Sequence, residues 1–208
     1  MKTFAELGIN KNLIKGLNDL NIKVPTEIQA KVIPILLESI TDIVGQAQTG
    51  TGKTAAYGLP LLQRIDPNKK VVQGLILCPT RELGQQVAKQ LFKFTKYTDK
   101  IFTESVYGGA RIEVQIQALK RPTHIVVATP GRLLDLIRRK AVDIRNVKTV
   151  ILDEADEMLS MGFKKELDEI LGFLANVECK WLFSATMPQG IKQIVKQHLS
   201  ATAHKIEI

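Results

Sequence analysis

Cysteines, aromatic residues and long apolar runs are all scarce in this 208-residue chain. Its two cysteines, Cys78 and Cys179, lie beside short apolar runs, so we expect buried thiols rather than a disulfide or a metal site. The histidines at 124, 198 and 204 show no metal-ligand spacing. No apolar run is long enough to cross a bilayer, and the amino terminus lacks the apolar block of a secretion signal. We therefore expect a cytoplasmic protein without a membrane segment.

Internal repeats, low-complexity tracts and linkers rich in glycine, proline or serine are also absent from the sequence. Its length, with 45% hydrophobic and 24% charged residues, suits one large domain with a proper core. Lysine and arginine exceed aspartate and glutamate by 29 to 21, which gives a formal net charge of +8. This excess is a weak indication of a polyanionic partner, because the basic residues are spread along the chain rather than gathered in a tail.

Short apolar runs alternate with amphipathic stretches along the chain. Most of these runs are continuous, which is typical of strands buried on both faces. We therefore expect an α/β fold with a mostly parallel central sheet and helices on both faces, whose ligands bind beyond the carboxyl ends of the strands. The expected strands span 42–45, 74–78, 102–107, 124–128, 149–152, 180–183 and 204–208, and the expected helices span 53–64, 80–95, 130–139, 164–175 and 188–199.

The run GQAQTGTGKT follows the first expected strand and opens a helix. Gly50 and Gly52 let the backbone bend around an anion, and the helix amino terminus adds partial positive charge. Lys53 can then reach the β- and γ-phosphates of a nucleotide, and Thr54 can ligate Mg²⁺. Ala47 stands where such loops usually have glycine, which the loop tolerates if its φ is negative. The alternative, a glycine-rich turn without a ligand, is disfavoured by the strand before it and the helix after it.

An acidic turn follows the buried strand at 149–152. Asp153 is placed to hold Mg²⁺ opposite Thr54, and Glu154 is placed to orient or deprotonate a water that attacks the γ-phosphate. Alone, such a pair usually only complements a helix dipole. Together with a phosphate loop in the same sheet, it favours a catalytic interpretation.

In this order the motifs resemble those of the DEAD-box RNA helicases over nearly the whole chain, and Ala47 is usual in that family. The resemblance implies a RecA-like P-loop domain over residues 1–208, with an adenine-recognition glutamine motif inside 1–40. The nucleotide contacts implied are Phe4, Ile22, Thr26, Gln29, Gln48, Thr49, Gly50, Thr51, Gly52, Lys53 and Thr54. The RNA contacts implied are Pro79, Thr80, Arg81, Gly108, Gly109, Thr129, Pro130, Gly131 and Arg132. The residues implied to couple hydrolysis to unwinding are Asp156, Ser184, Ala185 and Thr186.

Several of these positions keep an alternative reading. Gln29 offers an amide that can select adenine over guanine, and otherwise would be an exposed helix residue. Ile22 replaces the aromatic residue usual in the family, so we expect weaker adenine binding. Arg81 and Arg132 are either phosphate forks or partners of nearby carboxylates such as Glu82 or Asp135. Ser184 and Thr186 are either coupling residues or helix caps.

The resemblance further implies ATP and Mg²⁺ as cofactors and RNA as a partner, bound mainly through its backbone with little sequence preference. The family uses two RecA-like halves, and this chain matches only the amino-terminal one. We therefore expect a monomeric domain that binds nucleotide but neither hydrolyses ATP appreciably nor unwinds RNA alone. A DNA helicase domain, or a module that uses nucleotide only as a switch, are the alternatives.

Overall fold

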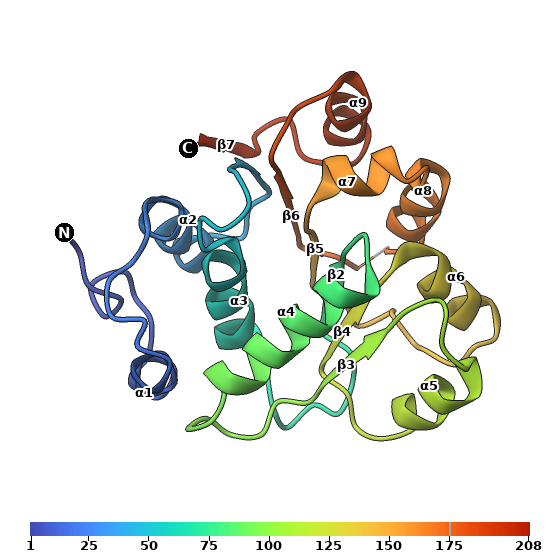
Figure 1. The fold of residues 1–208 in the computed structure, drawn as a ribbon, viewed down its shortest axis with the longest axis horizontal. Helices are drawn as coiled ribbons and strands as arrows, with labels where there is room; N and C mark the ends of the chain where they lie inside the picture. The colour runs from blue at the N-terminus through green and yellow to red at the C-terminus, as the bar shows by residue number, and fades with distance from the viewer. Residues whose placement is uncertain (175) are drawn as a thin grey trace.

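A computed structural model describes residues 1–174 and 176–208. Seven parallel strands form one sheet in the order β3-β4-β2-β5-β6-β1-β7, flanked by helices on both faces (Figure 1). This is the expected RecA-like α/β architecture. Within the described ranges, no helix combines the length and the apolar character that crossing a membrane requires.

The helices and strands alternate along most of the chain. The strands are β1 (Ile43–Gln46), β2 (Gly74–Leu77), β3 (Thr103–Val106), β4 (Ile125–Ala128), β5 (Thr149–Leu152), β6 (Cys179–Ser184) and β7 (His204–Glu207). The helices are α1 (Lys11–Asp19), α2 (Glu27–Glu38), α3 (Lys53–Arg64), α4 (Arg81–Phe94), α5 (Ile112–Leu119), α6 (Pro130–Arg138), α7 (Ala155–Ser160), α8 (Lys164–Phe173) and α9 (Gln189–His198).

Successive residues of each central strand point into two separate hydrophobic cores. In β2, Ile76 packs with α1 to α4, whereas Leu75 and Leu77 pack with α6 to α9 on the other face. The same alternation runs through β4, β5 and β6. Burial on both faces explains why these strands are continuous apolar runs in the sequence.

All seven expected strands exist, and each end lies within two residues of its expected position. The five expected helices exist with similar accuracy. The expected carboxyl end of α8, Ala175, lies outside the described residues. Four helices were not expected: α1, α2, α5 and α7. Both α5 and α7 are short, and Pro34 lies inside α2, where it removes a backbone donor.

The strand order sorts the motif-bearing loops into two neighbouring groups. The phosphate loop, the acidic turn and the Ser184–Thr186 segment follow β1, β5 and β6, which are adjacent in the sheet. The segments with the implied RNA contacts follow β2, β3 and β4, which are adjacent in the other half. The two halves meet at the β2–β5 ladder. All six loops therefore open on one edge of the sheet.

Candidate nucleotide and RNA site

The phosphate loop joins β1 to α3 through two glycines with left-handed backbone. Gly50 has φ 82° and Gly52 has φ 90°, conformations that favour glycine. A Cβ on Gly52 would also lie 2.5 Å from the Gln29 amide nitrogen, so this position excludes a side chain on two grounds. Ala47 is not among the residues with positive φ, which confirms the condition under which it can replace glycine.

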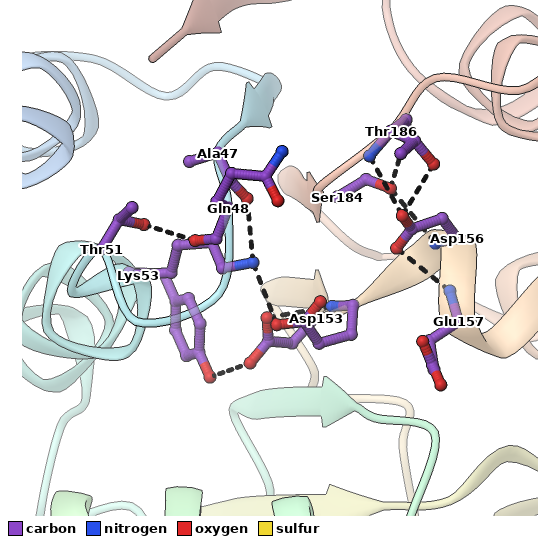
Figure 2. Close-up of polar contacts among 11 residues, drawn as sticks. Ala47, Gln48, Thr51, Lys53, Asp153, Asp156, Glu157, Ser184 and Thr186 are labelled. Atoms are coloured by element: carbon purple, nitrogen blue, oxygen red, sulfur yellow. Dashed lines mark hydrogen bonds and ion pairs between the residues drawn. The ribbon is translucent and has the colours of Figure 1, made fainter.

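Lys53 joins the phosphate loop to the acidic turn. Its Nζ donates to the Ala47 carbonyl at 3.1 Å and pairs with Glu154 Oε1 at 3.0 Å, and its side chain is 5% exposed. Figure 2 shows Lys53 reaching across from the loop to the turn. The lysine and the acidic turn, expected from the sequence to converge, lie side by side on the same edge of the sheet. A buried ammonium in this position suits the phosphates of a nucleotide.

Asp153 is fully buried at the end of β5. Its Oδ2 accepts from the Tyr57 hydroxyl at 2.8 Å, and its Oδ1 accepts from the Glu154 backbone N–H at 3.0 Å. Burial raises the pKa of Asp153 to about 6, and the Glu154 charge adds to this, although the Tyr57 hydrogen bond and Lys53 oppose the rise. Burial beside Asp153 also raises the pKa of Tyr57 well above its usual value. Tyr57, one helical turn after Lys53, was not predicted from the sequence; a hydroxyl inside an otherwise apolar helix was its only signal.

Glu154 has left-handed backbone, with φ 50° and ψ 52°, at the amino end of α7. This conformation costs a residue with a side chain about 1 kcal/mol and is common at functional sites. The strained backbone, together with the Lys53 ion pair, fixes the direction of the Glu154 carboxylate.

The oxygens of Thr54 and Asp153 are those that Mg²⁺ prefers. The Thr54 side chain lies close enough to the Tyr57 hydroxyl to oppose the rise in its pKa, and that hydroxyl is bonded to Asp153. Within residues 1–174 and 176–208, no three His, Cys, Asp or Glu side chains form a group that could hold a metal by themselves. A buried carboxylate with a raised pKa gains from a nearby cation, so the donor set fits a magnesium ion that arrives with phosphates.

Asp156, Ser184 and Thr186 form the network that the resemblance implies. Asp156 Oδ2 accepts from the Thr186 hydroxyl at 2.8 Å and from its backbone N–H at 3.0 Å. The Ser184 hydroxyl accepts from the Asp156 backbone N–H at 3.2 Å and donates to the Thr186 carbonyl at 2.7 Å (Figure 2). Burial tends to raise the pKa of Asp156, but these hydrogen bonds, led by that of Thr186, lower it overall. Neither hydroxyl caps α9, which begins after Pro188, whereas the Ser184 hydroxyl satisfies a first-turn N–H of α7.

Gln29 is buried and fixed in orientation. Its Oε1 accepts from the Thr26 backbone N–H at 2.9 Å, and its Nε2 donates to the Gly52 carbonyl at 3.0 Å. The alternative of an exposed helix residue is therefore wrong. The hydrogen bonds of the described residues leave one amide N–H and one carbonyl lone pair of Gln29 unused. This pair suits the donor and acceptor on the adenine edge, whereas guanine presents two acceptors there.

Two other residues of the amino-terminal segment pack in or against the core of the α1–α4 face. Phe4 is 3% exposed and packs inside the core of the α1–α4 face, so it can influence a nucleotide only through its neighbours. Ile22 is half-buried against the same core. It follows Asn21, which has a left-handed backbone with φ 58°.

Arg81 and Arg132 make no ion pair with Glu82 or Asp135 among the salt bridges of the described residues, so that alternative is wrong. Asp135 pairs with Arg139 instead. The Arg81 guanidinium lies 4.6 Å from the centre of the Tyr107 ring. Arg132 donates to the Ala110 carbonyl through both Nη atoms at 3.1 Å.

The remaining implied RNA contacts divide by exposure. Gly108, Gly109 and Gly131 are exposed, and Gly109 has φ 79°. Thr80 caps α4 by accepting from Leu83 N at 3.2 Å, which leaves its own hydroxyl hydrogen to donate. Pro79 and Pro130 are buried as the chain leaves the sheet, and Thr129 is 9% exposed.

Both cysteines are buried free thiols, as expected. Burial, with the Asp153 charge nearby, raises the pKa of Cys78 to about 12. Burial also raises the pKa of Cys179, whose sulfur accepts from Arg64 at 3.3 Å. Neither thiol is poised to react.

Comparison with known proteins agrees with this geometry. The DEAD/DEAH box helicase family model matches residues 26–194. The DEAD-box ATP-dependent RNA helicase CshA of Bacillus cereus is 47% identical over 98% of this chain, and the ATP-dependent RNA helicase DeaD of Escherichia coli is 46% identical over 95%. The chain spans 38% and 31% of the length of these two relatives. A crystal structure of a DEAD box protein from Methanococcus jannaschii, 40% identical, superposes with a TM-score of 0.93 over 99% of this chain and 55% of that one. This chain therefore belongs to the DEAD/DEAH box helicase family.

Proposed function

We propose that this domain binds ATP with Mg²⁺ and single-stranded RNA on one edge of its sheet, as one half of an RNA-dependent ATPase that unwinds short RNA duplexes. The observation that carries the proposal is the contact of Lys53 with Glu154 at 3.0 Å, which brings a phosphate-binding lysine and a candidate base to one point. A nucleotide-independent module would gain nothing from a buried carboxylate and a strained glutamate at that point.

Each residue of the nucleotide site has a separate task in this proposal. The loop backbone from Gln48 to Gly52 cradles the phosphates, and Lys53 moves from Glu154 to the β- and γ-phosphate oxygens. Thr54 and Asp153 would hold the magnesium ion, which neutralises phosphate charge when bound. Glu154, released from the lysine, orients the attacking water and accepts its proton.

RNA binds beside the nucleotide in the same proposal. Arg81 and Arg132 contact phosphates, while the Gly108–Gly109 turn lets the backbone approach the strand. Contacts of this kind read the backbone rather than the bases, so affinity depends on salt more than on sequence. A second RecA-like domain closes over ATP and RNA and adds further cationic groups to Lys53 at the γ-phosphate. Closure bends the RNA and opens a short duplex, and phosphate release reverses it.

The experiment compares wild type with Glu154→Gln in a protein that joins this domain to its second half. The variant is expected to bind ATP as tightly as wild type but to lose RNA-stimulated phosphate release, because the amide cannot accept the proton. Robust turnover by Glu154→Gln would contradict the role. The isolated 208-residue chain should bind nucleotide yet show negligible ATPase activity with RNA, and RNA-stimulated turnover by it would contradict the two-half proposal. Greater stimulation of the joined protein by single-stranded DNA than by RNA would favour a DNA helicase instead.

A further inference from the structure

One buried polar side chain outside all the motifs contacts two of the segments assigned to RNA. Gln115 lies on α5 and is 7% exposed. Its Oε1 accepts from the Tyr107 backbone N–H at 3.3 Å and from Arg132 Nη1 at 3.0 Å, and its Nε2 donates to the Tyr107 carbonyl at 3.0 Å. Gln115 is therefore hydrogen-bonded to the backbone N–H and the carbonyl of Tyr107, the residue before the Gly108–Gly109 turn, and also to Arg132.

These partners permit only one orientation of the Gln115 amide. Its oxygen faces two donors, and its nitrogen faces a carbonyl. A flipped amide would set its NH₂ group against the Tyr107 N–H and the Arg132 guanidinium, leaving buried groups unpaired. The side chain is therefore locked by its surroundings.

The contacts of Arg132 leave one edge of its guanidinium available. An arginine has five N–H donors. In Arg132, one N–H of Nη1 and one of Nη2 donate to the Ala110 carbonyl, and the second N–H of Nη1 donates to Gln115. The hydrogen bonds of the described residues use neither Nε–H nor the second Nη2–H. These two donors lie on the same edge and form the fork that matches two phosphate oxygens.

Tyr107 extends the network to the third RNA segment. Arg81 lies over one face of its ring at 4.6 Å, and the Gln85 side chain donates to its hydroxyl at 3.2 Å. The segments that follow β2, β3 and β4 are thus joined through Tyr107 and Gln115.

We propose that Gln115 is a positioning residue for RNA binding, which holds the Gly108–Gly109 turn and the free edge of Arg132 in one arrangement that fits the phosphates of a single strand. The inference rests on the proposed RNA face. Its physical basis is preorganisation: two groups that are ordered before RNA arrives lose less entropy on binding.

The test uses Gln115→Leu and Gln115→Glu, with Gln117→Leu as the matched control, since Gln117 is an exposed glutamine on the same helix. Affinity for a short labelled oligouridylate is measured by anisotropy over a salt series, and ADP affinity by calorimetry. Gln115→Leu is expected to lower RNA affinity about tenfold, as expected for the loss of a hydrogen bond to a charged group, and to leave ADP affinity unchanged. Gln117→Leu should change neither.

Gln115→Glu separates positioning from simple structural support. The carboxylate still accepts from Arg132 and from Tyr107 N–H, but it cannot donate to the Tyr107 carbonyl, and its charge competes with phosphate for the guanidinium. RNA affinity should fall and the slope of log affinity against log salt should shrink by about one, while ADP affinity stays unchanged. Unchanged RNA affinity in both Gln115 variants, or RNA affinity, ADP affinity and melting temperature that fall together, would overturn the inference.

A readout without RNA keeps this inference separate from the proposed function. If wild type and Arg132→Ala bind the oligouridylate equally, the proposed RNA face fails. The positioning of the loop is then decided by NMR on the free chain. The amide signals of Gly108 and Gly109 and the Nε signal of Arg132 should shift in Gln115→Leu and stay in place in Gln117→Leu. Signals that do not move in Gln115→Leu would overturn the positioning role itself.

Discussion

Lys53 and Glu154 form a nearly buried ion pair at 3.0 Å, so the phosphate-binding side chain and the candidate base hold each other before any nucleotide is present. The pair keeps both charges neutralised inside the protein, where an isolated charge would be costly. Under the proposed function, a nucleotide would replace Glu154 as the partner of Lys53, and binding would release the carboxylate to activate the attacking water.

Replacing Lys53 with alanine should lower ATP and ADP affinity at least tenfold. The lysine would contribute charge-assisted hydrogen bonds worth about 1.5–3 kcal/mol each, and its loss also leaves Glu154 facing the phosphates without a cation. Calorimetric titration of the purified chain measures the change. Lys192→Ala removes the same charge from an exposed position on α9 and should bind as wild type does. Equal affinity in Lys53→Ala and Lys192→Ala would refute the phosphate-loop assignment.

Replacing Asp153 with asparagine should stabilise the nucleotide-free chain at neutral pH. Because the pKa of folded Asp153 is raised to about 6, its contribution to stability is intact below pH 4 and declines as the pH rises to about 6. Above that pH, ionisation of the buried carboxyl lowers the free energy of unfolding by about 3 kcal/mol, and the neutral amide of asparagine avoids this cost. Tyr57 can turn its hydroxyl to accept from the new NH₂ group.

Melting temperatures of wild type and Asp153→Asn between pH 4 and 8, without nucleotide or magnesium, measure this effect. The two curves should meet near pH 4 and separate above pH 6, with the variant higher. Asp156→Asn is a control of opposite sign: because the pKa of Asp156 is lowered, that variant should be less stable than wild type by a nearly constant amount from pH 8 down to about pH 4. An Asp153→Asn curve parallel to that of wild type would show that Asp153 does not titrate as described.

Replacing Gln29 with alanine should remove the preference for adenine over guanine. The fixed amide has one donor and one acceptor left for the base, and alanine has neither. ADP and GDP affinities, which should differ in wild type, are then expected to converge. The melting temperature should also fall, because the capping box of α2 loses one of its two bonds. Gln90→Ala, at an exposed position on α4, should keep both the preference and the stability. Equal ADP and GDP affinities in wild type would defeat the role of Gln29.

Replacing Ser184 and Thr186 together with alanine should uncouple ATP hydrolysis from unwinding in a protein with both halves. The change removes the two hydroxyls that join the β6 loop to Asp156, while Lys53, Asp153 and Glu154 stay intact. RNA-stimulated ATPase should persist and duplex unwinding should be lost. Thr202→Ala, an exposed hydroxyl near β7, serves as the matched control. A parallel loss of both activities in the double variant would count against a coupling role.

The sequence predicted the nucleotide half of the site better than the RNA half. Asp153 and Glu154 follow β5 directly, and Lys53 opens the helix after the loop that follows β1, so locating β1 and β5 was enough to bring these residues together. Their convergence needed only the rule that parallel strands end on one edge.

The RNA half depends on side-chain contacts that no spacing reveals. Gln115 lies on α5, a short helix that was not predicted, and is hydrogen-bonded to Tyr107 and Arg132. Tyr107 follows β3, and its ring lies under the guanidinium of Arg81 at the start of α4. Spacing also could not show that Pro79 and Pro130 are buried, because proline is compatible with both exposed turns and the first turn of a helix.

A single ladder, β2–β5, joins the two halves of the sheet, and its last rung is the hydrogen bond from Asp153 N–H to the Leu77 carbonyl at 2.9 Å. The loops proposed to carry hydrolysis and the loops proposed to contact RNA thus form separate groups of adjacent loops with one shared border. Under the proposed function, a substitution in the loops after β2, β3 and β4 could change polyanion binding without moving Lys53, Asp153 or Glu154, which lie beyond that border.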